Sequence, residues 1–268
     1  MDQGGPQVLN IVIPMAGHGS RFQQAGYKVP KPLIPVHDVP MIQAVIDNLR
    51  PACEHRFYFL CQESHVRDYP LESILCNAAP GCQIQTLNRV TAGAACTVLL
   101  ASDGIDNDSP LMIANCDQWI DASIDDYLAE GTQCGIDAFL MTMKDDSPKW
   151  SYVMRDEHGE MTGVVEKEVV SDEATVGIYN FARGADFVSA AKDMIRENDR
   201  SKNEFYVAPV YSRLIHAKQN VQAVSIGDAG EVMHGLGTPD DLVAFLGRGF
   251  ETRVQSASHS SSQKRHAA

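Results

Sequence analysis

The sequence predicts an α/β protein with a mixed, mostly parallel central sheet. Short apolar runs alternate with amphipathic helical stretches over most of the chain, and this alternation is typical of parallel strands that are connected and covered by helices. A turn with two glycines follows the first apolar run, at the end of the strand where such sheets bind ligands. With 268 residues, the chain is long enough to bury a large core as one domain or as two small ones.

The first half of the chain supplies most of the predicted sheet. Apolar runs predict strands at residues 8–13, 56–61, 83–87, 111–114 and 137–142, and amphipathic stretches predict helices at residues 41–49, 63–78, 94–101 and 123–130. Pro40 stands just before the first of these helices, where a proline is well tolerated.

The pattern changes after residue 143. Two short apolar runs within residues 151–170 flank Asp156 and Gly159, a turn composition that predicts a β-hairpin. Beyond it we expect strands at residues 175–181 and 221–225 and helices at residues 185–197, 206–217 and 239–246. Residues 251–268 are rich in Ser, His and Gln without an apolar period, so we predict a disordered tail.

Composition excludes several classes of partner. The net charge is −13, with 22 Lys and Arg against 35 Asp and Glu, and this argues against a nucleic-acid partner. There is no uninterrupted apolar run long enough to predict a membrane span, and the N-terminus lacks the pattern of a signal peptide. We therefore expect a cytoplasmic protein that does not act at a membrane.

The seven cysteines are scattered, without a Cys-x-x-Cys pair and with an odd total. A zinc site or a disulfide framework is therefore not expected, and we predict reduced thiols that mostly pack in the core.

The turn after the first strand carries the clearest functional signal. Gly17 and Gly19 let backbone N–H groups approach an anion, and Arg21 and Lys31 supply positive charge. Prolines at positions 30, 32 and 35 argue against a helix there and predict a stiff loop. A triphosphate fits this loop better than a nicotinamide cofactor, whose fingerprint needs a third glycine; a tight strand-to-helix turn without a ligand is the alternative.

These residues carry a family resemblance. Residues 16–22 (AGHGSRF), 31–36 (KPLIPV) and 40–42 (PMI) resemble the signature of the sugar-phosphate nucleotidylyltransferases, also called NDP-sugar pyrophosphorylases. The resemblance extends over roughly residues 8–246. It implies a Rossmann-like three-layer sandwich of the glycosyltransferase-A type and a nucleotidyltransferase domain at residues 1–250. Residues 8–143 would bind the nucleotide and residues 144–250 the acceptor.

The resemblance also implies roles in nucleotide binding. Lys31 matches the family's phosphate-binding lysine, and Arg21 matches the arginine that binds the departing pyrophosphate. Residues 91–95, which alone suggest only the start of a helix, match a segment that lies against the nucleobase. The implied nucleotide-binding residues are Met15, Ala16, Gly17, Gly19, Ser20, Asn88, Gly93 and Ala94.

Asp117 is the candidate metal ligand. It follows the apolar strand at residues 111–114, at the carboxyl end where α/β sheets bind ligands, although an aspartate there can simply cap a turn. By resemblance, Asp117 holds Mg²⁺, a cation that prefers oxygen ligands and bridges phosphate oxygens. We therefore expect Arg21, Lys31 and Asp117 to be the catalytic residues.

The acceptor site is predicted from the second half. Glu166 and Lys167 alone would suggest a solvated surface pair, but together with Gly177 they match family segments that hold the sugar hydroxyls and the acceptor phosphate. Tyr152 stands where hexose-specific members have glycine, so we expect it to crowd the sugar pocket. Gly235 stands where relatives have an aspartate that is a second metal ligand; whether His234, Asp240 or another residue substitutes is open.

The resemblance implies transfer of a nucleotidyl group from an NTP to a sugar phosphate, with release of pyrophosphate. Two alternatives stay open: the same chemistry on a non-sugar phosphate or phosphonate, as in a cytidylyltransferase, and a nucleotide sensor without activity. A glycosyltransferase is disfavoured because residues 115–117 (NCD) lack its Asp-x-Asp motif. The base, the acceptor, the pathway and a homo-oligomeric state are open.

Overall fold

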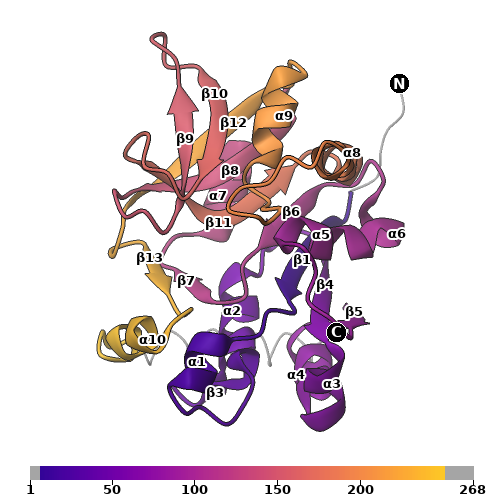
Figure 1. The fold of residues 1–268 in the computed structure, drawn as a ribbon, viewed down its shortest axis with the longest axis vertical. Coiled ribbons are helices and arrows are strands. Elements are labelled where there is room, and N and C mark those ends of the chain that lie inside the picture. Colours follow the sequence, from indigo (N-terminus) through magenta and orange to yellow (C-terminus); the bar gives the residue numbers. More distant parts are fainter. Residues whose placement is uncertain (1–6, 251–268) are drawn as a thin grey trace.

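The computed structural model describes residues 7–250, and within them a nine-stranded mixed sheet forms the centre of the molecule (Figure 1). The strand order is β10-β9-β11-β6-β1-β4-β5, with β8 paired to β11 and β12 paired to β8. The strands are β1 (Leu9–Met15), β4 (His55–Gln62), β5 (Gln83–Leu87), β6 (Leu111–Ala114), β8 (Ala138–Lys144), β9 (Ser151–Arg155), β10 (Met161–Glu166), β11 (Glu173–Phe181) and β12 (Val221–Asp228).

The strand directions confirm the predicted fold class. Strands β1, β4, β5 and β6 pair in parallel, and β8 pairs in parallel with β12. Strand β11 runs antiparallel to β6, β8 and β9, and β10 runs antiparallel to β9. Within the sheet, β10 and β11 therefore run against the direction shared by the other strands.

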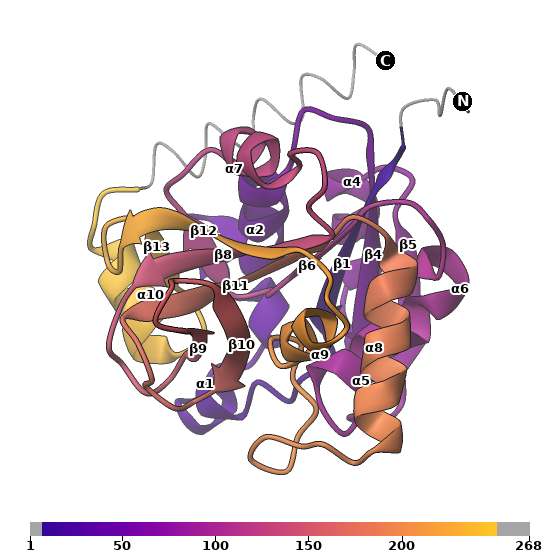
Figure 2. The ribbon, with the colours of Figure 1, turned by 90° about the horizontal axis from the view of Figure 1, so that it is seen from above.

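Helices cover both faces of the sheet, which gives the predicted three layers. Figure 2 shows α2 and α7 on one side of the sheet and α8 and α9 on the other. The first face is covered by α2 (Met41–Leu49), α3 (Glu63–Asp68), α4 (Leu71–Ala78) and α7 (Ile124–Gly131), and the second by α5 (Ala94–Val98), the 3₁₀ helix Leu99–Ala101, α6 (Ser102–Ile105), α8 (Gly184–Arg196) and α9 (Val210–His216).

Alternation of the side chains along β1 explains why the sheet has a hydrophobic core on each face. Ile11 and Ile13 pack in the cluster under α2 and α4, whereas Val12 packs in the cluster under α5 and α8, and all three side chains are fully buried. Because successive side chains of a strand point to opposite faces, a continuous apolar run fits a strand that is covered on both sides.

A third, smaller core lies beside the main sheet. It brings together Phe22, Trp119 and Phe245 with other apolar side chains. The elements around it are α1 (Ser20–Gln24), the 3₁₀ helix Lys31–Leu33, the ribbon β2 (Pro35–Val36) with β3 (Val39–Pro40), the ribbon β7 (Gln118–Ile120) with β13 (Met233–Gly235), and α10 (Pro239–Leu246). Through this core, the C-terminal part of the described chain packs next to the loop that follows β1.

Several predicted boundaries were wrong for identifiable reasons. The predicted helix at 63–78 is two helices, because Pro70 interrupts the hydrogen-bond ladder. The predicted helix at 206–217 begins only at Val210, after Pro209. The segment with three prolines does contain a 3₁₀ turn, which tolerates Pro32 near its start, and the short helix α1 directly follows the glycines.

The predicted hairpin is confirmed. Its strands are β9 and β10, and Gly159 adopts a φ of 83° in the turn between them. The predicted tail at residues 251–268 lies outside the described residues. Within residues 7–250, no helix is both long and apolar enough to cross a membrane.

The cysteines are free, and their burial differs widely. Cys53, Cys76 and Cys134 are exposed, whereas Cys61 is fully buried in β4. Burial raises the pKa of the Cys61 thiol to about 12, and only the thiolate form reacts rapidly with electrophiles.

We therefore expect a brief treatment of the native protein with iodoacetamide at neutral pH to label Cys76 and Cys134 well before Cys61. Peptide mass spectrometry after increasing labelling times measures this order. Labelling in urea is the control, because unfolding should make all seven thiols react together. Rapid labelling of Cys61 in the native protein would contradict the packing described here.

Candidate active site

The predicted residues of the glycine loop and the predicted metal ligand Asp117 lie after the ends of β1 and β6. These strands pair in parallel, so the loops that follow them are neighbours. The glycine loop follows β1, and Asn115 and Asp117 follow β6. Residues distant in sequence therefore meet at one edge of the sheet.

The glycine loop is closely packed on one side and open on the other. Gly19 adopts a φ of 61°, and a Cβ atom there would lie 3.2 Å from Lys31 Cβ. At Gly17 a Cβ atom would meet nothing within 4 Å. The side chains of Met15 and Ala16 are buried in the two cores, so only their main chain is available to a nucleotide.

The start of α1 completes this loop. The backbone N–H groups of Phe22 and Gln23 both donate to Gly19 O. The N–H groups just before them belong to the first turn of a helix, where no intrahelical acceptor exists. Ser20 and Arg21 are exposed in this turn, and the buried ring of Phe22 anchors it.

Gln62, which was not predicted, holds the loop in place. It ends β4, and its Nε2 donates to Ala16 O at 2.9 Å and to Gly17 O at 3.1 Å. Ser64 Oγ donates to the other side of the same amide at 3.4 Å. Because both loop carbonyls accept from Gln62, the peptide N–H groups of the loop are fixed in orientation. No sequence motif marked this residue; its only signal was its place at the end of a strand next to β1.

Lys31 and Asp117 form an ion pair between Lys31 Nζ and Asp117 Oδ2. Their side chains are 19% and 27% exposed, so the pair remains partly accessible to solvent. Burial by itself would lower the pKa of Lys31, but the charge of Asp117 and its hydrogen bond outweigh burial, and the pKa is raised. Lys31 is therefore a permanent cation next to the glycines.

The position of Asp117 depends on the returning C-terminal segment. Leu236 N donates to Asp117 O at 2.7 Å, next to the ladder between β7 and β13. A Cβ atom at Gly237 would lie only 2.6 Å from Asp117 Oδ2. A glycine at position 237 is thus required for the carboxylate to occupy its place.

The candidates for a second metal ligand make other contacts or lie at the surface. The His234 ring packs against Phe245 and Phe250. Asp241, the neighbour of Gly235, accepts a hydrogen bond from Thr238 Oγ1 at 2.7 Å, and its backbone N–H donates to the same hydroxyl, which caps α10. Asp240 is exposed on α10. Within residues 7–250, no group of three or more His, Cys, Asp or Glu side chains is placed to hold a metal ion.

A single carboxylate still fits Mg²⁺. This ion keeps several waters and commonly binds one or two carboxylates together with substrate phosphates. Asp117 offers oxygen ligands beside the glycine loop, where a triphosphate would supply the remaining ones. The single carboxylate of Asp117 therefore fits a cation that binds together with the nucleotide better than a cation held by the protein alone.

A second hollow opens beside Asn115, and we call it the acceptor cavity after the role that the sequence resemblance predicts for Glu166 and Gly177 in its lining. It has a volume of about 240 Å³ and is lined by Ala94, Asn115, Lys149, Trp150, Ser151, Glu166, Thr175, Gly177, Tyr179, Tyr206 and Val207. Three residues predicted from the sequence are among them: Ala94, Glu166 and Gly177. Gly177 adopts a φ of 83°, and a Cβ atom there would lie 2.1 Å from Asn115 Nδ2, so glycine lets the two strand ends meet.

Glu166 and Lys167 are linked at the rim of the acceptor cavity. Ser151 Oγ donates to Glu166 Oε2, and Lys167 Nζ lies 3.8 Å from Glu166 Oε1. Lys167 Nζ also donates to Tyr206 OH at 2.7 Å. Burial raises the pKa of Glu166, although the Ser151 hydrogen bond and the charge of Lys167 oppose the shift.

The expectation for Tyr152 was wrong. Its side chain is fully buried in the main core, and its OH donates to Ser147 O at 2.7 Å. Because side chains alternate along β9, Ser151 faces the acceptor cavity and Tyr152 points away from it. Tyr152 therefore does not crowd the acceptor.

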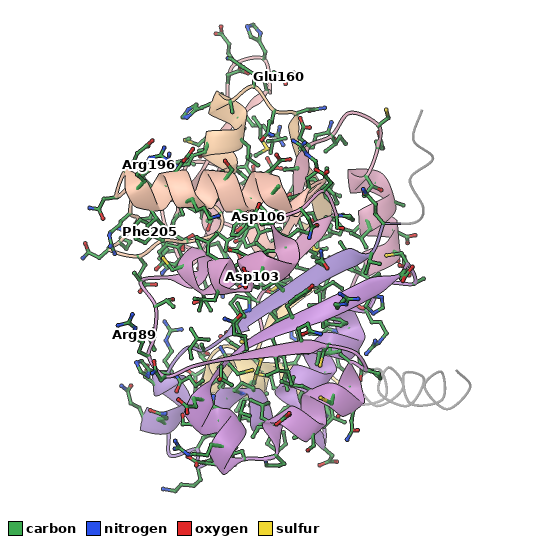
Figure 3. The ribbon with its side chains drawn as sticks, turned by 90° about the vertical axis from the view of Figure 1, so that its right-hand side faces the viewer. Arg89, Asp103, Asp106, Glu160, Arg196 and Phe205 are labelled. Carbon is green, nitrogen blue, oxygen red and sulfur yellow. The ribbon has the colours of Figure 1, made fainter. Side chains whose placement is uncertain are left out.

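The segment at residues 91–95 is fixed against Phe205. Phe205 N donates to Ala92 O at 2.9 Å, and Ala95 N donates to Phe205 O at 3.0 Å. A Cβ atom at Gly93 would lie 2.4 Å from the Phe205 backbone, so only glycine fits. Asn88 is exposed beyond β5. Figure 3 shows Arg89 and Phe205 toward the same side of the molecule.

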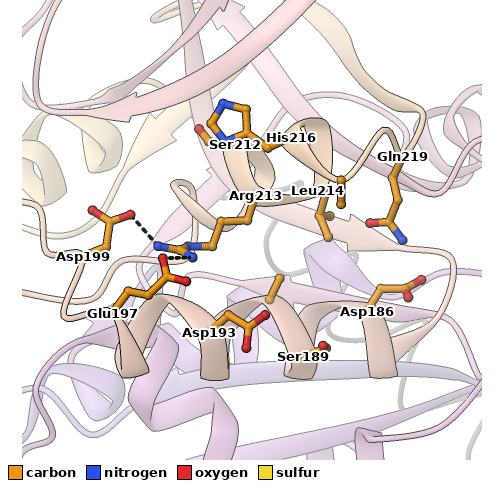
Figure 4. Close-up of a pocket in the computed structure, with 12 residues that line it drawn as sticks. Asp186, Ser189, Asp193, Glu197, Asp199, Ser212, Arg213, Leu214, His216 and Gln219 are labelled. Carbon is orange, nitrogen blue, oxygen red and sulfur yellow. Dashed lines mark hydrogen bonds and ion pairs between the residues drawn. The ribbon is translucent and has the colours of Figure 1, made fainter.

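A larger hollow of about 580 Å³ lies between α8 and α9, away from these strand ends (Figure 4). Arg213 fills part of it and pairs with Glu197 at 2.7 Å and with Asp199 at 2.8 Å. The carboxylates that line this hollow are thus partly neutralised within the protein. The hollow shares no lining residue with the acceptor cavity.

Comparison with known proteins defines the class. The family model described as nucleotidyl transferase matches residues 11–243. The chain therefore belongs to the nucleotidyl transferase family and is a nucleotidyltransferase enzyme. No curated protein sequence gives a significant match.

Solved structures agree with this fold. The nucleoside-diphosphate-sugar pyrophosphorylase of Vibrio cholerae RC9 is 25% identical, with a TM-score of 0.73, and the match covers 89% of this chain and 100% of that one. A putative glucose-1-phosphate thymidylyltransferase from Bacillus anthracis, in complex with a sucrose, is 20% identical, with a TM-score of 0.70 and coverages of 90% and 94%. A UDP-glucose pyrophosphorylase complexed with UDP-glucose is 15% identical, with a TM-score of 0.72 and coverages of 92% and 100%.

The role of Gln62 can be tested by substitution. Gln62→Leu keeps a similar size but removes both hydrogen bonds to the glycine loop. We expect NTP binding to weaken roughly tenfold, the order of magnitude that corresponds to the net loss of these bonds. Isothermal titration with the NTP that binds the wild type most tightly measures this change. Gln85→Leu, at an exposed position of β5, is the matched control. Unchanged affinity in Gln62→Leu would contradict the role.

Proposed function

We propose that this enzyme transfers a nucleotidyl group from an NTP to a sugar phosphate and releases pyrophosphate. The observation that carries the proposal is the Lys31–Asp117 pair, in which Lys31 packs against Gly19 of the glycine loop and Asp117 follows two residues after Asn115, which lines the acceptor cavity. A donor site for a triphosphate and a separate cavity that contains several polar side chains thus lie near each other at the ends of β1 and β6.

The donor half of the proposal rests on charge and backbone geometry. The glycine loop and the first turn of α1 present N–H groups, and Arg21 and Lys31 add positive charge beside them. Residues 91–95, fixed against Phe205, would lie along the base. When bound, Mg²⁺ would neutralise charge on the phosphate oxygens from its place at Asp117.

The acceptor half rests on the lining of its cavity. Hydroxyl groups of Ser151, Thr175 and Tyr179, the Asn115 amide and the Glu166 carboxylate surround it. These groups can donate to and accept from sugar hydroxyls. Since Tyr152 points into the core, the main reason to prefer a non-sugar acceptor has gone.

The reaction needs positioning more than acid–base chemistry. A phosphate acceptor is already ionised, so it can attack the α-phosphorus in line without a general base. Lys167, at the rim of the cavity, would hold the acceptor phosphate, and Arg21 and Lys31 would stabilise the negative charge on the departing pyrophosphate. No covalent enzyme intermediate is required.

We also propose a cytoplasmic location, where NTPs are made and used. It is supported by seven free thiols, none of which is needed for a disulfide.

Substitution of the central ion pair tests the donor half. We expect Lys31→Ala and Asp117→Ala each to lower kcat by a factor on the order of 10² to 10³, because each removes a charge that acts in the transition state. Steady-state pyrophosphate release measures this loss, and circular dichroism checks that each variant is folded. Near-normal turnover in either folded variant would refute the proposed site.

The acceptor class is tested with the wild-type enzyme. We expect pyrophosphate release when a mixture of ATP, GTP, CTP, UTP and dTTP is supplied with a hexose 1-phosphate and Mg²⁺, and loss of that release with excess EDTA. Phosphocholine and a small phosphonate serve as comparison acceptors. Release with these and not with any sugar phosphate would overturn the sugar assignment, while no release with any acceptor would favour a nucleotide sensor.

A further inference from the structure

One charged side chain in the acceptor cavity is not neutralised by the protein. Lys149 and Glu166 are the two charged residues in the lining. Glu166 is engaged by Ser151 and by Lys167. Lys149 has no carboxylate within ion-pair distance in the described part of the chain, and its Nζ instead lies 4.5 Å from the centroid of the Trp150 ring.

The position of Lys149 is defined by the ring beneath it. Trp150 Nε1 donates to Asp145 Oδ2 at 2.8 Å, and Ser147 N donates to Asp145 Oδ1 at 2.6 Å. Asp145 thus holds both the indole ring and the loop that precedes it. An ammonium group over an indole face is attracted by the ring quadrupole, but the ring carries no charge that would neutralise it. The Lys149 side chain is exposed, and its ammonium group remains available to pair with an anion.

The second lysine at the same rim already has a role. Lys167 N donates to Trp150 O at 2.9 Å, so the segments that carry the two lysines are adjacent where β9 begins and β10 ends. Lys167 is bonded to Tyr206 and is assigned to the acceptor phosphate in the proposed function. An acceptor with a single phosphate leaves Lys149 without an anion.

Lys149 also borders a neighbouring hollow. A space of about 180 Å³ is lined by Lys149, Trp150 and Gly235 among others, and its charged side chains are Lys149, Arg248, Asp145 and Asp241. The Lys149–Trp150 pair therefore forms the wall between this space and the acceptor cavity. A small anionic substituent on the acceptor, directed toward this wall, would meet the ammonium group. A carboxylate needs less room there than a second phosphate.

We propose that Lys149 selects sugar phosphates that carry a carboxylate in addition to the reacting phosphate, such as uronic acid 1-phosphates. This inference rests on the proposed function and specifies the substrate class of its acceptor cavity. The carboxylate pairs with the Lys149 ammonium at the wall formed with Trp150, while the hydroxyls face Ser151, Glu166 and Asn115.

A matched pair of acceptors tests the selection. Glucuronic acid 1-phosphate and glucose 1-phosphate differ only in the group at C6, so their kcat/KM ratio isolates the contribution of the carboxylate. With the NTP mixture and Mg²⁺, we expect the wild type to prefer the glucuronate by roughly tenfold or more, the size expected for one charge-assisted hydrogen bond. The same ratio with galacturonic acid 1-phosphate and galactose 1-phosphate repeats the test for another configuration.

Substitution then assigns the preference to one residue. We expect Lys149→Met, which keeps the unbranched apolar chain but not the charge, to bring the ratio close to one, and Lys149→Arg to retain a clear preference. Lys192→Met removes another exposed lysine, from α8, and should leave the ratio as in the wild type.

The outcomes separate this inference from the proposed function. Pyrophosphate release with both acceptors at equal kcat/KM, or an acid preference that survives in Lys149→Met, would overturn the role of Lys149 and leave the sugar-phosphate reaction standing. An equal loss for both acceptors in Lys149→Met would also overturn it, because it would place Lys149 on the shared phosphate. No release with any sugar phosphate would overturn both.

Discussion

The ion pair between Lys31 and Asp117 joins parts of the chain that are 86 positions apart, and the rest of the site depends on it. Gly19 packs against Lys31, and Gly237 leaves room for the Asp117 carboxylate. Gln62 fixes the loop from a third strand. A cation and an anion that neutralise each other at the strand ends can separate toward a triphosphate and its metal, so the pair is both a structural contact and the centre of the proposed chemistry.

The sequence predicted the parts of this architecture that depend on short-range patterns. The buried strands, the hairpin turn at Asp156 and the glycine loop were correct because apolar runs and turn residues mark them locally. Ribbons such as β7 with β13 were missed because each strand has three residues, which is too short for a period. Pro70 divides a helix that its apolar pattern suggested was continuous.

Short-range sequence patterns were also insufficient to place single residues of the site. Tyr152 was assigned to the acceptor pocket from its position in a motif, but strand alternation turns it into the core and brings Ser151 to the cavity. Gln62 and Lys149 belong to no recognised motif, and only the packing of β4 and of the Trp150 loop shows what they face. The identity of an acceptor depends on such contacts, so motifs alone left it open.

The central claim is that the acceptor phosphate attacks the α-phosphorus of the nucleotide. A sugar 1-phosphate labelled with ¹⁸O at its non-bridging phosphate oxygens, incubated with NTP and Mg²⁺, tests it by mass spectrometry of both products. The account predicts that all of the label stays in the nucleotide-activated sugar and that the pyrophosphate is unlabelled. Label in the pyrophosphate, or the release of unlabelled pyrophosphate without a labelled nucleotide product, would contradict it.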